Sequence, residues 1–205
     1  MNWFGPDIRS ILNQPVFYRM LKKVSGCRKN RANYVKEYLR PKESDKVLDI
    51  GCGTADILEY LPSVAYVGFD INLYYINWAR EKYGHRGLFI CRKVGKDIVD
   101  EFSNFDLVMA NGVIHHLADA DAEELFITAR MALKPSGRFV AIDPCFIERQ
   151  SLITRCIFSL DRGHFIRNQE QYIKLASLAF PVVRETIRQD ISRLPFTHII
   201  MECTL

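Results

Sequence analysis

Residues 47–56 read VLDIGCGTAD and combine an apolar run, a carboxylate and two glycines separated by one residue. The apolar run that ends at Ile50 is typical of a buried strand in a parallel sheet. The glycines allow the chain to turn sharply and allow a ligand to lie against the backbone. In open α/β sheets, ligands bind beyond the carboxyl ends of the strands. The stretch therefore predicts a nucleotide-binding corner at the end of a strand.

Strand-like and helix-like segments alternate along the rest of the chain. The expected helices lie over 54–61, 73–83, 121–133 and from residue 168 onward. Asn72 and Asp121 are expected to cap the second and third of them. The expected strands are 46–50, 65–69, 88–92, 105–110, 138–142, 182–188 and 197–204. This alternation predicts an α/β fold with a doubly wound, Rossmann-like sheet of seven mostly parallel strands and helices on both faces.

The composition suits one folded domain. The chain has 205 residues, of which 48% are hydrophobic and 25% charged, so we expect a single domain over 1–205. Two segments depart from the alternation. We expect 1–41 to form a helical lid and 145–167 to form an insertion that shapes the substrate pocket. The net charge of +4 is small and diffuse, which argues against nucleic acid as the partner. The one local exception is a basic run at 22–31.

The cysteine pattern and the hydropathy indicate the compartment. The six cysteines are scattered and form no C-x-x-C pair, which favours reduced thiols over a disulfide framework or a zinc site. No apolar stretch approaches the roughly 20 residues that span a membrane, and the first residues show no secretory signal pattern. We therefore expect a cytoplasmic protein.

Two carboxylates beside the glycines restrict the ligand. A dinucleotide site requires a third glycine that admits a pyrophosphate, but Asp56 occupies that position and Asp49 precedes the turn. These charges repel phosphate and favour a cation. Asp70, at the end of the second expected strand, is placed to accept hydrogen bonds from both hydroxyls of a ribose. The ligand that combines an adenosine ribose with a cationic, phosphate-free tail is S-adenosylmethionine.

Four segments carry a family resemblance, and they are 47–56, 67–72, 105–117 and 133–143. In this order and spacing, the chain resembles the class I S-adenosylmethionine-dependent methyltransferases, particularly those that act on small molecules. The closing segment 197–203 is similar to the family's antiparallel last strand. The resemblance implies that S-adenosylmethionine is the cofactor and S-adenosylhomocysteine the product.

The resemblance also implies roles for single residues. The loop of Asp49, Gly51, Cys52 and Gly53 would surround the methionine part of the cofactor. Asp70 would hold the ribose and Ile71 would pack on the adenine. Asn111 and Gly112 would line the sulfonium end. The contact with the adenine edge would come from the segment after the third strand, either from Lys93 and Val94 or from Asp97, and we assign it to Val94.

Methyl transfer is an in-line displacement that needs alignment and exclusion of water, and a base only when the acceptor must lose a proton. His115 and His116 follow the fourth strand and are the candidate bases, with His116 preferred. Their alternative role is to cap a turn and pack beside the cofactor. Asp143 ends the fifth strand and either orients a substrate or caps the loop. No metal is expected. By resemblance, a catechol-type metal site has acids after the fourth and fifth strands and an Asp-Asn pair, whereas this chain has Asn111 and Asp143-Pro144 in those places.

The substrate pocket is expected from the two segments outside the alternation. Phe17 and Tyr18 are predicted to cover the site. Arg162, His164 and Arg167 are predicted to contact a polar or anionic substrate, or alternatively to pair with acidic neighbours. Cys145 follows Asp143-Pro144 as in cytosine-C5 methyltransferases, but the other signatures of that family are missing.

The expected reaction is methyl transfer to a small molecule, with oxygen favoured as acceptor over nitrogen and carbon. A nicotinamide-dependent oxidoreductase is one alternative, and a non-catalytic cofactor-binding protein of the same fold is another. A carrier protein or an RNA that docks on residues 22–31 also stays open as a partner.

Overall fold

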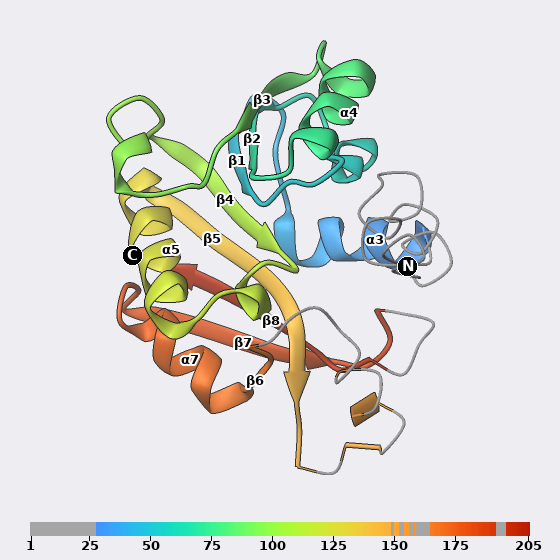
Figure 1. The fold of residues 1–205 in the computed structure, drawn as a ribbon, viewed down its shortest axis with the longest axis vertical. Helices are drawn as coiled ribbons and strands as arrows, with labels where there is room; N and C mark the ends of the chain where they lie inside the picture. Colours follow the sequence, from blue (N-terminus) through green and yellow to red (C-terminus); the bar gives the residue numbers. More distant parts are fainter. Residues whose placement is uncertain (1–27, 149, 152–153, 156–157, 159–164, 192–195) are drawn as a thin grey trace, which may run out of the picture.

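The computed structural model describes residues 28–148, 150–151, 154–155, 158, 165–191 and 196–205 (Figure 1). The described strands are Lys46–Ile50 (β1), Ala65–Asp70 (β2), Gly87–Cys91 (β3), Phe105–Asn111 (β4), Leu133–Phe146 (β5), Arg167–Asn168 (β6), Val182–Arg188 (β7) and His198–Thr204 (β8). They form one sheet in the order β3-β2-β1-β4-β5-β8-β7, and the short β6 pairs with β5. β8 runs antiparallel to both of its neighbours, and the other pairs are parallel. The predicted Rossmann-like sheet with an antiparallel last strand is thus confirmed.

The described helices cover both faces of the sheet (Figure 1). They are the α-helices Arg28–Tyr34 (α3), Leu73–Tyr83 (α4), Asp119–Ala132 (α5) and Gln169–Ser177 (α7), the π-helix Val35–Leu39 (η1), and the 3-10 helices Asp56–Glu59 (η2), Lys96–Ile98 (η3) and Ile114–His116 (η4). One buried cluster joins α5 and α7 to the sheet, and a second joins α3, η1 and α4 to it. Neighbouring residues Val47 and Leu48 of β1 enter different clusters, because successive side chains of a strand point to opposite faces.

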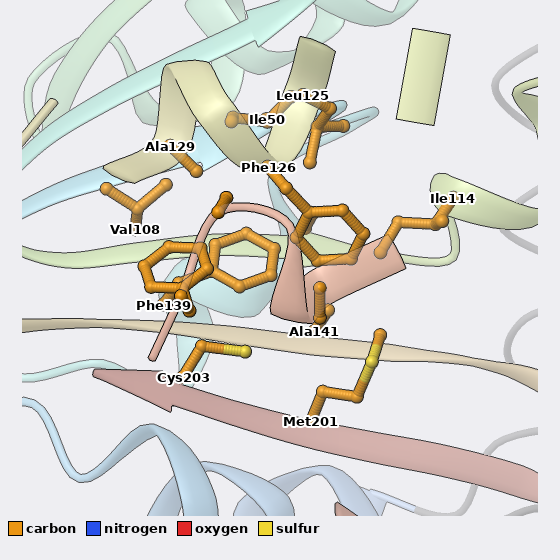
Figure 2. Packing of buried hydrophobic residues seen from close by; sticks show 14 of the residues in the cluster. Ile50, Val108, Ile114, Leu125, Phe126, Ala129, Phe139, Ala141, Met201 and Cys203 are labelled. Atoms are coloured by element: carbon orange, nitrogen blue, oxygen red, sulfur yellow. The ribbon is translucent and has the colours of Figure 1, made fainter. Parts of the chain in front are cut away.

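The first cluster forms the core beneath α5. Figure 2 shows Phe126 and Ala129 of α5 facing Phe139 of β5, with Met201 of β8 nearby. The rings of Phe126 and Phe139 meet edge to face, with centroids 5.5 Å apart. Aromatic pairs prefer this geometry because the positive ring edge meets the negative face. This packing fixes β4 and β5, whose carboxyl ends carry the candidate site.

Several local signals are confirmed. The side chain of Asn72 caps α4 by accepting hydrogen bonds from the backbone N–H groups of Tyr74 and Tyr75. The helix expected from residue 168 is present as α7, and its start is stabilised by a reciprocal capping box between Asn168 and Gln171, which was not predicted.

The expected helix over 54–61 is wrong for most of its length. Ala55 has a φ of 51°, in the left-handed region, so regular helix does not begin directly after the glycines. The chain then forms only the short η2 before Pro62. The glycine loop is therefore followed by a turn and the short η2, and not by the N-terminus of the expected helix.

The capping box expected at Asp121 is also wrong. α5 begins at Asp119, and its N-cap residue Ala118 makes no side-chain capping bond. The carboxylate of Asp121 pairs instead with the ammonium of Lys93, at 2.6 Å. No helix within the described residues is long and apolar enough to cross a membrane.

Candidate active site

A cavity of about 380 Å³ lies at the carboxyl edge of the sheet, where β1 and β4 end beside each other. The strand order reverses here, because the chain continues from β1 to β2 on one side and from β4 to β5 on the other. Ligands bind at such a switch point in α/β sheets. The cavity is lined by Asn30, Arg31, Tyr34, Asp49, Gly51, Cys52, Asp56, Ile57, Asn111, Gly112, His115, Ile142, Pro144, Ile191 and His198. It brings together the predicted loop residues Asp49, Gly51 and Cys52 with the predicted Asn111 and Gly112.

The glycine loop has a conformation that explains its sequence. The backbone N–H groups of Gly51 and Cys52 both donate to the carbonyl of Phe69 on β2, at 2.8 and 2.9 Å. Gly51 has a φ of 72°, and a Cβ at this position would lie 2.5 Å from Cγ2 of Val113. Only glycine satisfies both constraints. The loop after β1 consequently lies directly against the loop after β4.

Asp70 holds the glycine loop from the side of β2. Its Oδ2 accepts a hydrogen bond from the N–H of Gly53 at 2.8 Å, and its Oδ1 accepts one from the N–H of Asn72 at 2.8 Å. The carboxylate is half-buried at the end of β2, as expected for a ribose contact. The side chain of Ile71, beside it, is 77% exposed and presents an apolar surface of the kind that an adenine ring stacks on.

The segment after β3 makes its contacts within the protein. The side chain of Val94 packs in the first buried cluster. Lys93 pairs with Asp121 and Glu124 of α5, and Asp97 pairs with Arg92. Because the Val94 side chain is part of the core, its predicted contact with the adenine edge is restricted to the backbone.

His115 and Asp143 form a buried pair at the cavity. Nδ1 of His115 lies 2.6 Å from Oδ1 of Asp143, and the same oxygen accepts the backbone N–H of His115 at 3.1 Å. A carboxylate at this distance requires a hydrogen on Nδ1, so the neutral ring carries its lone pair on Nε2. The His115 side chain lines the cavity, with the residue 5% exposed, and Asp143 is fully buried. Asp143 thus fixes the orientation of the His115 ring at the wall of the cavity.

His115 and His116 differ in where they lie relative to the cavity. The two rings lie beside each other, with centroids 4.0 Å apart. His116 is exposed, however, and is not among the residues that line the cavity. The sequence preference for His116 is therefore not followed below. The orientation of η4 decides between adjacent histidines, and no local sequence signal reports that orientation.

The sequence pattern predicts a substrate contact for Arg167, but the structure places this residue among protein groups and not among the residues that line the cavity. It is buried, and its five N–H groups are all engaged. Nε and Nη2 donate to Oδ1 of Asp119, at 3.0 and 2.7 Å, and Nη2 also donates to the carbonyl of Leu117. Nη1 donates to the carbonyls of Ile114 and Phe165. Arg167 thus holds the loop of His115 and the start of α5.

Arg167→Ala is expected to lower the free energy of unfolding by about 3 kcal/mol, because it leaves buried carbonyl groups without donors. Urea denaturation followed by circular dichroism measures this loss. Arg184→Ala, on the exposed side of β7, is the matched control and is expected to change stability by less than about 0.5 kcal/mol. Equal stability of the two variants would contradict the clamping role.

Several predicted site residues fall elsewhere. Phe17, Tyr18, Arg162 and His164 lie outside the described residues. Cys145 is buried, and burial together with the charge of Asp143 raises the pKa of its thiol to about 12. A thiol with this pKa is protonated at neutral pH, so Cys145 is not an activated nucleophile.

Sequence reasoning missed several residues around the cavity, among them three with polar side chains. Tyr34 of α3 donates its hydroxyl hydrogen to Oδ1 of Asn111 at 2.7 Å, which orients that amide. His198 of β8 lines the cavity, and burial lowers the pKa of its ring to about 4, so it is neutral at physiological pH. Arg31 of α3 also lines the cavity. No local pattern marks these positions, because the fold brings them together from distant parts of the chain.

Residues 48–139 match the family model described as a methyltransferase domain. The sheet order, the glycine loop and the carboxylate after β2 agree with this match.

Comparisons with individual proteins agree. The chain is 31% identical over 114 residues to phosphoethanolamine N-methyltransferase of Plasmodium falciparum. The matched stretch covers 53% of this chain and 42% of that protein. The chain thus spans less than half the length of this curated relative. Its fold is similar to a phosphoethanolamine N-methyltransferase of Haemonchus contortus, with a TM-score of 0.73, 14% identity, and coverage of 98% of this chain and 60% of that one. It is also similar to a TehB-like methyltransferase of Corynebacterium glutamicum, with a TM-score of 0.63, 16% identity, and coverage of 92% and 94%.

Proposed function

We propose that this chain transfers the methyl group of S-adenosylmethionine to a small-molecule acceptor, with His115 as the base. The observation that carries the proposal is that one cavity is lined by His115, which Asp143 holds, by residues of the glycine loop and by Asn111. The cofactor would supply a methyl group bound to a cationic sulfur, and the sulfur would leave as the neutral thioether of S-adenosylhomocysteine. The chain has to align the acceptor, exclude water and accept a proton.

The residues present fit this cofactor. Asp49 is 2% exposed and lines the cavity with Asp56, so two carboxylates face the space beside the loop. They favour an ammonium and disfavour the pyrophosphate of a dinucleotide. Asp49 and the loop would hold the methionine part, Asp70 the ribose and Ile71 the adenine. Asn111 and Gly112 would lie at the sulfonium end.

A hydroxyl is the first candidate for the acceptor. A hydroxyl oxygen is a poor nucleophile until its proton leaves, so it benefits most from a base such as Nε2 of His115. The acceptor side of the cavity is partly apolar, with Ile142, Pro144 and Ile191, and it contains the neutral ring of His198 as a polar contact. Within the described residues, the N-terminal segment contributes Tyr34, whose hydroxyl reaches Asn111.

An amine nitrogen is the second candidate. Both phosphoethanolamine methyltransferases named above act on nitrogen, as their names state. Arg31 places a cation on the cavity wall, where it could pair with an anionic group of such an acceptor. An ammonium acceptor also has to lose a proton before it attacks, so the same base serves.

The experiment that tests the function uses labelled S-adenosylmethionine and two series of acceptors, small phenols and alcohols in one and small amines in the other. Transfer of label to a member of either series supports the proposal and identifies the atom. Calorimetry with S-adenosylhomocysteine and NAD runs in parallel. Binding of NAD alone would favour the oxidoreductase, and binding of S-adenosylhomocysteine without transfer to any acceptor would favour a non-catalytic protein.

Arg31→Ala is expected to affect amine acceptors that carry an anionic group more than amine acceptors that lack one. If an anionic amine is the acceptor, its KM should rise about 10-fold while the KM of the same amine without the anionic group stays within 2-fold. Phosphoethanolamine and ethanolamine are the pair to compare by methyl-transfer assay. Lys36→Ala, an exposed cation on η1 that does not line the cavity, is the control. An unchanged KM for phosphoethanolamine would remove Arg31 from the site.

A further inference from the structure

A buried tyrosine contacts the carboxylate that begins the glycine loop. The hydroxyl of Tyr66 on β2 donates to Oδ2 of Asp49 on β1 at 2.6 Å. Both residues are almost completely buried, at 2% exposure each. Burial, and then the negative charge of Asp49, raises the pKa of Tyr66 well above its usual value, so the phenol keeps its hydrogen. The neutral Tyr66 hydroxyl is therefore the donor, and the acceptor is the Asp49 carboxylate, which also lines the cavity.

The sheet is built around this tyrosine. A Cβ at Gly68 would lie 2.9 Å from Cε1 of Tyr66, and a Cβ at Gly87 would lie 2.8 Å from Cδ1 of the same ring. Both distances are shorter than real side chains tolerate. Gly68 is paired with Asp49 in the register of β1 and β2, and Gly87 is paired with Tyr66 in the register of β2 and β3. The two glycines leave a slot through which the ring reaches along the strands to Asp49.

The slot also contacts the loop itself. A Cβ at Gly68 would lie 2.9 Å from Sγ of Cys52. Cys52 lines the cavity, and its backbone N–H donates to the carbonyl of Phe69 on β2. The ring of Tyr66 and the side chain of Cys52 thus both lie close to Gly68, and the Tyr66 hydroxyl reaches the carboxylate that begins the loop. Ordinary filling of the core does not require a hydroxyl at this position, and phenylalanine would fill the same slot.

We propose that Tyr66 is a positioning residue that orients the Asp49 carboxylate toward the ammonium group of the cofactor's methionine part. The inference rests on the cofactor assignment of the proposed function. A carboxylate accepts about four hydrogen bonds, so the bond to Tyr66 leaves capacity for an ammonium. A single strong donor restricts the rotation of the carboxylate, and a charged hydrogen bond depends steeply on such orientation.

The test compares two ligands by calorimetry. S-adenosylhomocysteine carries the amino acid part, and 5′-methylthioadenosine shares the nucleoside and the sulfur but lacks that part. Tyr66→Phe is expected to weaken the binding of S-adenosylhomocysteine about 10-fold and to leave the binding of 5′-methylthioadenosine within 2-fold. In an Asp49→Asn background, Tyr66→Phe is expected to have no further effect, because the two residues act as one unit.

Tyr83→Phe is the matched control. Tyr83 belongs to the same buried cluster and donates to the carboxylate of Glu59 at 2.9 Å, but it does not line the cavity. Its variant should leave both affinities unchanged. Equal weakening of both ligands by Tyr66→Phe would show a merely structural role, and no weakening would show no role; either result overturns the inference alone. Failure of the unmodified chain to bind either ligand would overturn the cofactor assignment as well.

Discussion

Asp70→Ala is expected to weaken the binding of S-adenosylhomocysteine by at least about 100-fold. The carboxylate holds the backbone of Gly53 and the start of α4, and it lies where the ribose hydroxyls are proposed to bind. Loss of charged hydrogen bonds to the loop and to the ligand costs about 1.5–3 kcal/mol each, and about 2.7 kcal/mol corresponds to this change in affinity. Isothermal titration calorimetry measures it.

A carboxylate at the opposite end of the sheet provides the control for Asp70. Asp106, near the start of β4, accepts the backbone N–H of Lys46 at 2.9 Å and pairs with Lys134. Asp106→Ala therefore removes a similar contact without touching the cavity, and its affinity for S-adenosylhomocysteine should stay within about 2-fold of the unmodified chain. Binding by Asp70→Ala within about 5-fold of the unmodified chain would show that the ribose lies elsewhere.

His115→Ala is expected to lower kcat by about 10²- to 10⁴-fold, the usual contribution of a positioned general base. The affinity for S-adenosylhomocysteine should change little, since the proposed cofactor contacts come from other residues. The measurement is methyl transfer at saturating cofactor, with the acceptor found in the screen. Asp143→Asn is expected to lower kcat as well, because the amide no longer stabilises the protonated ring that forms when the proton is accepted.

The neighbouring histidine makes this prediction specific. His116→Ala removes an exposed ring next to the same loop and should lower kcat by less than about 5-fold. A larger loss in His116→Ala than in His115→Ala would reverse the assignment and restore the preference drawn from the sequence. Similar, small losses in both variants would indicate that the acceptor reacts without a base from this loop.

The fold could be predicted because its signals are local. The apolar runs of β1 and β4, the cap at Asn72 and the start of α7 at Asn168 each depend on a few adjacent residues. The same holds for the positive φ of Gly51, whereas its close contact with Val113 comes from a distant segment. The expected capping box at Asp121 failed because α5 begins two residues earlier, at Asp119, and the carboxylate of Asp121 pairs with Lys93 from a segment distant in sequence.

The site could be predicted only in part, for the same physical reason. The strand ends placed Asp49, Gly51, Asn111 and Gly112 at one edge, and the cavity contains all of them. The role of Arg167 depends on carbonyl groups about fifty positions earlier in the chain, and its charge alone suggested a substrate contact. The choice between His115 and His116, and the contact of Tyr66 with Asp49, likewise require the folded backbone.

The clamp formed by Arg167 has a consequence for how the site moves. One guanidinium joins β6, the loop after β4 and the first turn of α5, so a fluctuation that opens the loop has to break several bonds in one event. Segments that open only together form a single cooperative unit with a common opening free energy. We therefore expect His115, the proposed base, to keep its orientation between turnovers, and we expect acceptor and product to exchange by motion of other walls of the cavity.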